Sequence, residues 1–492
     1  MAQGFVEKIE KAPEEISYDD VLICPRYSEI SPSEVDTKSP FSRSISLTTP
    51  IVSSPMDSVT EHLLAIGIAC MGGLGIIHKN LSIADQVEEV AKVKRWQSGK
   101  IVNPQMLRPN QTIGEARRRM EHEGISGFLV VNSGGKLVGL LTRRDFDYDP
   151  LGDGVLIGDV MTSKDEGKLI LADEQTTMEQ AQEILWKHRI EKLPIVDADF
   201  RPKGLFTKKD IRKRRQFPNA THDAHGRLCV GAAVGATGDF LERAKALVEA
   251  GVDVIVVDAS LGHTKNVGEA VRALKKLPEI KDVVAGNIVT ADAARFLMDA
   301  GADGLRVGIG PGSICTTRMV TGYGRPQLSA VADVADAAGG IVPVIADGGI
   351  KVSGDIVKAF AGGADSIMIG NLLARTDESA GDIVQRGSQR YKKYRGMGSK
   401  AVLEAGGDRY PKKSVPEGEE GLVPCAGPLA DVFRQLEGGL RQAMGGLGCR
   451  MIEELRSKTF FIRITPAGLQ ESHVHDIWLE TEPPPNFRNW NQ

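Results

Sequence analysis

Eight short apolar runs recur along the chain without the alternation of a half-buried strand. They are TPIVSSPM (49–56), GLGIIH (73–78), LCVGAAVG (228–235), VDVIVVDAS (252–260), DVVAGNI (282–288), ADGLRVGIG (302–310), VPVIADGG (342–349) and ADSIMIGN (364–371). Apolar runs of this length are typical of parallel strands buried on both faces. Helical stretches lie between them, and several end in a glycine followed by aspartate and the next strand, as in RAKALVEAGVDVIVV. The glycine is expected to end the helix.

Eight strand–helix units in succession predict an α/β fold, a (β/α)8 TIM barrel. An open doubly wound sheet is the alternative. Barrel active sites lie at the carboxyl ends of the strands, often with phosphate after strands seven and eight. Small and polar residues follow several expected strands, namely SSPMDS (53–58), Asp258, Asn287, GIGPGSICTTR (308–318), DGG (347–349) and Gly370-Asn371. We therefore expect a phosphate site at the last two, although DGG alone could be only a turn.

One segment is repeated. Residues 112–145 and 177–210 align without a gap, and each copy predicts helix, strand, turn, strand and helix. Two copies are too few for a solenoid, so a pseudo-symmetric pair is expected between the second and third barrel strands. The pair resembles a tandem CBS (Bateman) module. The resemblance implies purine nucleotides of the ATP or GTP type at Thr142, Asp145, Thr207 and Asp210. Helix capping is the alternative role of each threonine.

These patterns divide the chain into three segments. Residues 1–98 and 217–492 form the two parts of the expected catalytic barrel, and 99–216 form the CBS module, with copies at about 100–155 and 160–216. Residues 381–430 are polar and rich in Gly, Lys and Arg, and predict little regular structure. A loop of this length is typical of a mobile active-site flap. A disordered linker is the alternative.

Composition narrows the function classes. A net charge of −4 gives no sign of specific nucleic-acid binding. No apolar run approaches the roughly 18 residues of a membrane span, and the N-terminus lacks the apolar core of a signal peptide, so a cytoplasmic protein is expected. The six cysteines are scattered without a CxxC pair, which disfavours a disulfide framework or a zinc site.

Cys315 stands at the end of a glycine-rich loop, GIGPGSICTTR. Two roles are open on the residues alone. The loop is a tight turn in which the cysteine is a small buried hydrophobe, or its backbone surrounds a ligand or ion and the cysteine is a nucleophile.

The motifs SSPMDSVTE, GGLGIIHKN, GPGSICTTR, GRPQLSAV, ADGGIKVSGDI, YRGMGS, DRY and PAGLQESHVHD occur in this order. Together they resemble the inosine-5′-monophosphate (IMP) dehydrogenase family, along essentially the whole chain. The resemblance implies oxidation of IMP to xanthosine monophosphate (XMP) with NAD, a step toward guanine nucleotides. A cysteine adds to carbon 2 of the purine, hydride leaves for NAD, and water cleaves the resulting thioimidate.

The resemblance also implies residue roles. Cys315 is the nucleophile, and Thr317 with Arg409 and Tyr410 activates the water. Arginine is an awkward base because its pKa exceeds about 12. A proton route from Thr317 to Glu417 is the alternative, and the sequence leaves both open.

The same resemblance implies three sets of binding residues. IMP is expected at Ser54, Met56, Ser313, Asp347, Gly349, Gly370, Asn371, Tyr394, Gly396, Met397, Gly398 and Glu417. NAD is expected at Asp258, Ser260, Asn287, Arg306 and Gly308. K⁺ is expected at the carbonyls of Gly310, Gly312 and Cys315, with Glu471, Ser472 and His473 from a neighbouring subunit. Oxygen ligands suit this hard cation, and two close histidines make ESHVHD a poor zinc motif. The assembly implied is a homotetramer, with a nucleotide-driven octamer as the alternative.

The chain departs from the family pattern in places. Asn371 stands where serine is often found, Ala259 where serine is common, and Pro411 where phenylalanine is frequent. The loss of a hydroxyl at Ala259 puts one cofactor contact in doubt.

Two other functions fit part of the pattern. A GMP reductase shares the barrel, the cysteine loop and IMP binding, and converts GMP to IMP with NADPH without needing a water-activating Arg-Tyr flap. A non-catalytic nucleotide sensor would keep the CBS pair on an inactive barrel. The presence of Cys315, Thr317 and Arg409 argues against the sensor.

Overall fold

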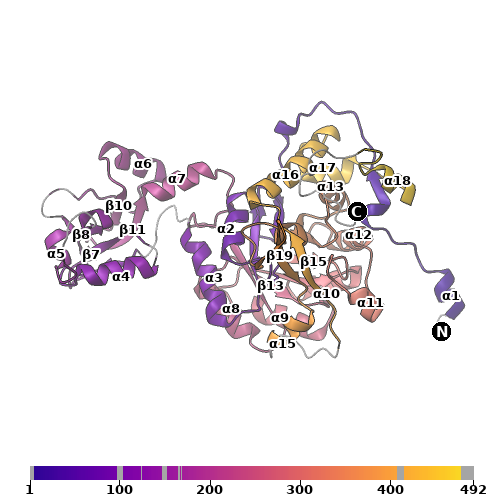
Figure 1. Cartoon of the computed structure of the whole chain (residues 1–492), viewed down its shortest axis with the longest axis horizontal. Helices are drawn as coiled ribbons and strands as arrows, with labels where there is room; N and C mark the ends of the chain where they lie inside the picture. Colours follow the sequence, from indigo (N-terminus) through magenta and orange to yellow (C-terminus); the bar gives the residue numbers. More distant parts are fainter. Residues whose placement is uncertain are drawn as a thin grey trace. The chain divides into compact units, whose positions relative to one another are not determined.

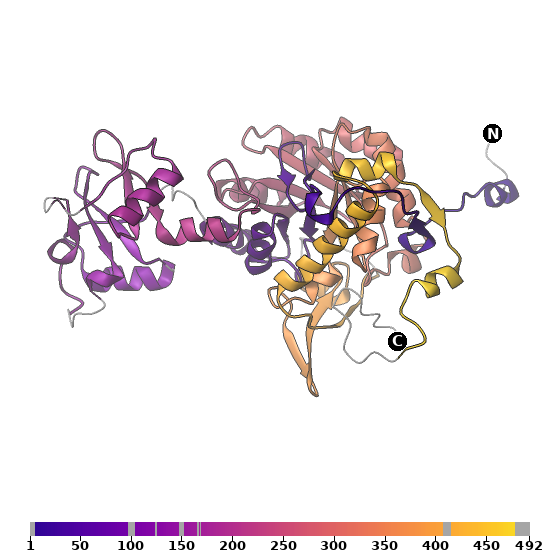
Figure 2. The ribbon, with the colours of Figure 1, turned by 90° about the horizontal axis from the view of Figure 1, so that it is seen from above.

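A computed structural model of the chain describes residues 5–96, 104–123, 125–146, 152–164, 167, 169–406 and 415–477 (Figures 1 and 2). The described residues fall into two compact units. One is drawn from Met1–Lys94, Asn219–Thr221 and Leu228–Gln492, and the other from Arg95–Pro218 and His222–Arg227.

The larger unit is built around a closed barrel of parallel strands. The strands are β4 (Ile51–Ser53), β5 (Leu74–Ile77), β12 (Val230–Val234), β13 (Val254–Asp258), β14 (Asp282–Ile288), β15 (Gly304–Val307), β16 (Val344–Asp347) and β17 (Ser366–Ile369). Each lies inside one of the eight apolar runs, so the predicted barrel is confirmed. The pairing of β17 with β4, which aligns Ile367 with Ile51, closes the ring and excludes the open sheet.

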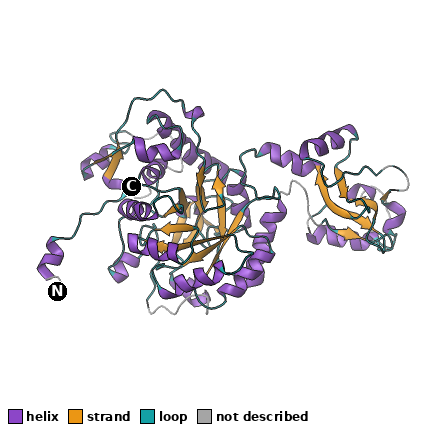
Figure 3. Ribbon diagram, turned by 180° about the vertical axis from the view of Figure 1, so that it is seen from behind, coloured by secondary structure: helices purple, strands orange, loops and turns teal. Residues whose placement is uncertain are grey.

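Helices surround the strands (Figure 3). Apolar side chains fill the interior of the barrel. The surrounding helices are α2 (His62–Cys70), α3 (Ile83–Trp96), α8 (Phe240–Glu249), α9 (Lys265–Lys275), α10 (Ala291–Asp299), α12 (Gln327–Ala338), α13 (Ser353–Ala361) and α16 (Leu429–Gly446). Val52, Ile76, Val256 and Met368 belong to one fully buried cluster inside the barrel. Burial of each such side chain stabilises the fold by roughly 1.5–3 kcal/mol.

Glycines end the helices as the pattern predicts. Gly251 and Gly301 follow α8 and α10 with φ of 92° and 98°. This left-handed conformation suits glycine and turns the chain into β13 and β15.

The smaller unit contains the two repeats. In the first copy, α4 (Ile113–Glu123), β7 (Gly127–Val131) and β8 (Leu137–Thr142) precede a 3₁₀ turn, η3 (Arg143–Asp145). In the second, α6 (Met178–Lys187), β10 (Lys192–Val196), β11 (Pro202–Thr207) and α7 (Lys208–Gln216) follow the same order. A cluster of Leu129, Leu137, Leu140, Val196 and Leu205 joins the two copies. The predicted element order is confirmed, except that a 3₁₀ turn begins where the last helix of the first copy was expected.

The prediction of little regular structure in 381–430 is wrong for its described residues. β18 (Ile383–Arg386) and β19 (Gln389–Arg395) form an antiparallel hairpin, β20 (Glu420–Pro424) pairs with β19, and α15 (Lys400–Gly406) lies between. Gly387, with φ of 60°, provides the turn, and the hairpin projects from the barrel (Figure 2). The polar residues of QRYKKYR show no apolar alternation that would have indicated this strand.

In the ranges that the structure describes, no helix combines the length and the apolarity needed to span a bilayer.

Candidate active site

A cavity of about 960 Å³ opens at the carboxyl ends of the barrel strands. Its size suits a nucleotide ligand. Every described residue expected to bind IMP or NAD lines it, namely Ser54, Met56, Asp258, Ser260, Asn287, Arg306, Gly308, Ser313, Asp347, Gly349, Gly370, Asn371, Tyr394, Gly396, Met397, Gly398 and Glu417. The structure therefore brings together, in one cavity, residues from strand ends spread over the whole barrel sequence.

Cys315 lies in this cavity, in the loop between β15 and α11 (Thr317–Thr321). It is half-buried, and its thiol donates a hydrogen bond to the Thr317 hydroxyl, with the two atoms 3.2 Å apart. Thr317 Oγ1 in turn lies 3.1 Å from Glu417 Oε2, to which it donates. A thiol that faces a cavity and starts a hydrogen-bonded chain does not fit the role of a buried hydrophobe.

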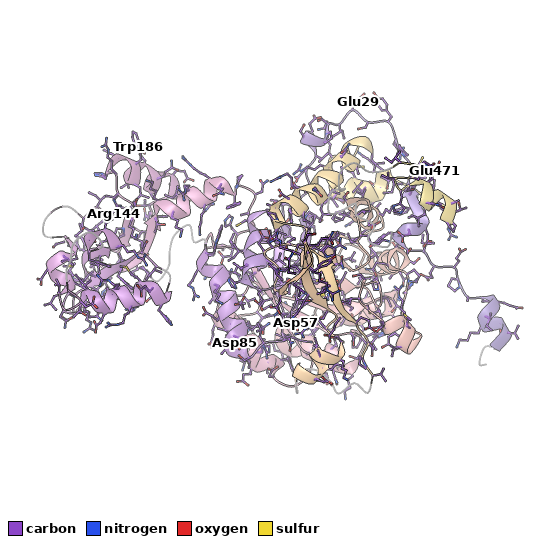
Figure 4. All side chains as sticks on the ribbon, in the orientation of Figure 1. Glu29, Asp57, Asp85, Arg144, Trp186 and Glu471 are labelled. Atoms are coloured by element: carbon purple, nitrogen blue, oxygen red, sulfur yellow. The ribbon has the colours of Figure 1, made fainter. Side chains whose placement is uncertain are left out.

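The loop of Cys315 is held by the segment that follows α15. The Thr316 N–H donates to the Glu417 carbonyl at 3.3 Å, and the Glu419 N–H donates to the Ile314 carbonyl at 3.0 Å. Earlier in the chain, Arg395 on β19 donates a hydrogen bond to the Asp57 carboxylate, with Nη2 and Oδ2 2.6 Å apart. Asp57 is labelled in Figure 4. Residues 396–398 and 417–418 thus line one side of the cavity, beside the loop that carries the thiol.

Four charged side chains of alternating sign lie at the strand ends, two of them buried and two partly buried. Lys79, which follows β5, donates to the Asp258 carbonyl and lies 3.6 Å from its carboxylate. Arg306 on β15 bridges the two acids, with contacts of 2.5 Å to Asp258 and 2.9 Å to Asp347. Such pairs are maintained in low dielectric because each charge compensates its neighbour.

Burial raises the pKa of Asp258, but the charges of Lys79 and Arg306 outweigh burial and lower it overall. Burial likewise lowers the pKa of Arg306, and the two carboxylates outweigh it and raise the pKa. Asp258 and Arg306 are therefore ionised at neutral pH, and Asp258 presents a carboxylate acceptor at a fixed position.

Amide groups hold Asp347 in place from the other side. Asn287 Nδ2 donates to its carboxylate at 2.8 Å, and Gln327 Nε2 donates to its main-chain carbonyl at 3.1 Å. A carboxylate oriented in this way can accept bonds from two adjacent ligand hydroxyls.

The expected phosphate end of the cavity combines glycine backbone with neutral hydroxyls. Gly349 has a φ of 82°, and a side chain on Gly370 would place its Cβ 3.1 Å from the Tyr394 hydroxyl. Burial raises the pKa of Tyr394 to about 12, although a hydrogen bond with Ser313 acts in the opposite direction. Tyr394 is therefore a neutral hydrogen-bond donor over the physiological range.

The residues expected to hold K⁺ fall into two places. Gly310, Gly312 and Cys315 share the loop at the cavity, and the Gly312 carbonyl accepts the Cys315 N–H at 3.1 Å. Carbonyl oxygens carry a second lone pair, so this donor set fits a hard monovalent cation. Glu471 ends α18 (Pro466–Glu471) and is exposed, as are Ser472 and His473 (Figure 4). In the part of the chain that is described, no group of three His, Cys, Asp or Glu side chains could hold a metal ion.

The expected regulatory residues lie at matching places in the two repeats. Thr142 ends β8 and Thr207 ends β11. The Thr142 hydroxyl and N–H both donate to the Asp145 carboxylate, at 3.0 and 2.6 Å. These bonds are those of a cap at the start of η3. Contact of these residues with a nucleotide stays a prediction. Nothing is described of the Asp210 side chain.

Arg409, Tyr410 and Pro411 lie outside the described residues. Sequence reasoning missed several cavity residues, among them Gln327, Lys79 and Arg375. Lys79 follows the second strand, so applying the strand-end rule to that strand would have found it. Arg375 comes from the turn after Asn371, and no sequence pattern singles it out.

Comparison with known proteins gives consistent matches. A family model for the IMP dehydrogenase / GMP reductase domain matches residues 15–475. The inosine-5′-monophosphate dehydrogenase of Aquifex aeolicus is 50% identical, over 97% of this chain and 99% of the relative. That of Bacillus subtilis is 48% identical, over 96% and 97%.

Solved structures are also similar. A GMP reductase variant from Trypanosoma brucei, in complex with guanosine 5′-monophosphate, has a TM-score of 0.89 and 41% identity, over 96% of this chain and 100% of that one. The same reductase in complex with guanosine 5′-triphosphate has a TM-score of 0.78 and 38% identity, over 93% and 99%. A match of this length and identity extends through both units, and the chain belongs to the IMP dehydrogenase / GMP reductase family.

Proposed function

We propose that the chain is an IMP dehydrogenase, which oxidises IMP to XMP with NAD as the hydride acceptor. The observation that carries the proposal is the hydrogen-bonded chain from Cys315 through Thr317 to Glu417 at the cavity. A nucleophile joined to a proton route is what a two-step reaction of addition and hydrolysis requires.

The chemistry follows from the difficulty of removing hydride from an aromatic carbon. The Cys315 thiolate forms a C–S bond to carbon 2 of the purine, and that carbon becomes tetrahedral. Its hydrogen leaves with the electron pair and reduces NAD to NADH. Water then adds to carbon 2 of the thioimidate, the C–S bond breaks, and XMP and the thiol are released.

Activation of the water has two candidate routes. Thr317 and Glu417 already share a hydrogen bond, which supports proton transfer from water through the hydroxyl to the carboxylate. Arg409 and Tyr410 are the other candidates and enter on the family resemblance.

The buried charges support binding of two ribose groups. Asp347 accepts the ribose hydroxyls of IMP, and Asp258 accepts those of the nicotinamide ribose, on either side of Arg306. The expected phosphate ligands Ser313, Gly349, Gly370 and Tyr394 line the same cavity. The cavity therefore offers the substrate and the hydride acceptor adjoining places.

Regulation and assembly form further parts of the proposal. Residues 99–216 are a CBS module that binds purine nucleotides, and the carbonyls of the Cys315 loop hold K⁺ together with Glu471, Ser472 and His473 of a second copy. Bound K⁺ would supply charge that organises the loop backbone. The exposure of Glu471 to His473 on one copy supports a role toward another.

GMP reductase is the second candidate, favoured by the likeness to the Trypanosoma brucei enzyme. Assays of both reactions on the purified protein separate the two. We expect NADH to form from IMP and NAD in the presence of K⁺. Consumption of NADPH with GMP, without NADH formation from IMP, would overturn the proposal in favour of the reductase.

A further inference from the structure

Arg375 and Asn371 form a hydrogen-bonded pair at the expected phosphate end of the cavity. Both line the cavity, four residues apart, at either end of α14 (Asn371–Ala374). Arg375 is only 9% exposed, and its Nε and Nη2 both donate to Asn371 Oδ1, at 3.0 and 2.5 Å. The guanidinium is thus buried beside the asparagine rather than extended into solvent.

The pair determines which way the Asn371 amide faces. A guanidinium has donors and no acceptor, so the atom that it contacts must be the amide oxygen. The Asn371 NH₂ group, with its two donors, is therefore the part of the amide left for other contacts. The serine often found at this position offers a ligand a single hydroxyl donor.

Arg375 also brings positive charge to a neutral cradle. Ser313, Gly349, Gly370 and Tyr394 carry no charge, and Tyr394 stays protonated because burial raises its pKa to about 12. The Asp347 charge acts to raise that pKa and the Arg375 charge acts to lower it, so Arg375 opposes a carboxylate whose field also extends to the Tyr394 hydroxyl. A doubly charged anion among these groups would be stabilised by the guanidinium in a low-dielectric site.

We propose that Arg375 and Asn371 together form the anion-recognition element for the 5′-phosphate of the substrate. Arg375 is a positioning residue that directs the Asn371 NH₂ toward the phosphate and supplies the counter-charge. The inference rests on the proposed function for the identity of the substrate. It adds a role for Arg375, and an orientation for the Asn371 amide, in selecting a nucleotide over a nucleoside.

The direct test compares IMP with inosine, which lacks the phosphate. Arg375→Gln removes the charge, and we expect it to weaken IMP binding about 10- to 100-fold by calorimetry, the range for a hydrogen bond to a charged group. Inosine affinity should stay within about two-fold. In turnover, KM for IMP should rise while kcat at saturating IMP stays near the parent value. Arg434→Gln, an arginine exposed on α16, is the matched control.

The pH profile and a conservative variant separate recognition from a merely structural role. The second ionisation of a phosphate monoester lies near pH 6. The ratio of parent to Arg375→Gln affinity for IMP should therefore increase between pH 5.5 and 7.5. Arg375→Lys keeps the charge and should restore part of the affinity. Asn371→Ala completes a double-mutant cycle. The fold-loss of IMP affinity in the double variant should be smaller than the product of the fold-losses in Arg375→Gln and Asn371→Ala.

Three results would overturn the inference. They are an equal loss of IMP and inosine binding in Arg375→Gln, a ratio that is flat with pH, and an unchanged affinity for IMP in a folded Arg375→Gln. If the parent neither binds nor oxidises IMP, the proposed function fails by itself. Ribose 5-phosphate then serves as the probe, and the subsite stands only if the parent binds it and Arg375→Gln binds it at least ten-fold more weakly.

Discussion

Cys315 combines a glycine-rich loop backbone with a thiol that lines the cavity. Its loop sequence admits a turn or a reactive site, and the structure places its thiol in the cavity, 3.2 Å from the Thr317 hydroxyl. That contact distinguishes it from Cys449, which is fully buried and whose pKa is raised by burial. Surroundings, more than residue type, decide which cysteine is suited to nucleophilic attack.

Cys315→Ala removes the nucleophile and leaves the phosphate and ribose contacts in place. We expect NADH formation to fall by more than about 10³-fold, because removal of a nucleophile abolishes the covalent route. IMP affinity, measured by calorimetry, should stay within a few-fold of the parent value. A Cys315→Ala variant that turns over at the parent rate would refute the assignment.

Thr317→Val keeps the shape of the side chain and breaks the link between the thiol and Glu417. If this link activates water, hydrolysis should slow by about 10²–10⁴-fold while hydride transfer continues. Rapid mixing should then show a burst of about one NADH per site followed by slow turnover. Steady turnover of Thr317→Val at the parent rate would contradict the Thr317–Glu417 route and favour activation of the water by Arg409 and Tyr410.

At the scale of elements, strand ends were predictable and loop partners were not. Buried parallel strands are recognisable in the sequence as apolar runs. The carboxyl ends of the eight barrel strands lie at one face, as expected. Lys79 was within reach of the same rule. The bond from Arg375 to Asn371 was not, because it depends on the side-chain conformation of one arginine in a short turn.

The hairpin of β18 and β19 shows why the flap region was misjudged. Residues 389–395 read QRYKKYR, with no apolar alternation to indicate a strand. The strand forms because β18 and β20 satisfy its backbone hydrogen bonds on both sides. Of these partners, β20 comes only after the segment that contains α15, so this pairing leaves no local pattern in the sequence.

α2 depends on a carboxylate from α3. Glu89 Oε2 accepts the His62 N–H and contacts the His62 ring, each at 2.7 Å, while Lys92 donates to Oε1. Burial raises the pKa of Glu89, but these hydrogen bonds outweigh it and lower the pKa from 4.5 to about 2. Glu89 thus caps the start of α2 from a neighbouring helix.

Glu89→Gln tests this cap through its pH dependence. Because the folded pKa is depressed, the charged carboxylate stabilises the fold above pH 4.5, and its contribution is lost as pH falls through about 2. We expect Glu89→Gln to lower the free energy of unfolding at pH 7 by on the order of 3 kcal/mol. Urea titrations should show the difference shrinking below pH 4.5. A difference independent of pH would contradict the role of the charge.

At the scale of the whole molecule, the repeat pair interrupts the barrel sequence without interrupting the barrel. β5 precedes the insert and β12 follows it, yet the two strands pair in parallel, aligning Gly75 with Val230. The repeats have their own apolar clusters. The barrel ring therefore closes without a strand from the repeats.

Replacing residues 99–216 with a short Gly/Ser linker should leave the barrel able to oxidise IMP, within a few-fold of the parent rate. Any effect of ATP or GTP on that rate should disappear. NADH assays with and without each nucleotide measure both outcomes. Circular dichroism verifies that the shortened chain is folded, and a folded chain without activity would show that the insert takes part in catalysis.

The most direct measurement is a single turnover with IMP that carries deuterium at carbon 2, with NAD present and the protein in excess. The deuterium should appear in the reduced dinucleotide. Mass spectrometry of the quenched protein should find the purine nucleotide attached to the peptide that contains Cys315. Reduced dinucleotide without deuterium, or turnover with an adduct absent at every quench time, would contradict a covalent IMP dehydrogenase.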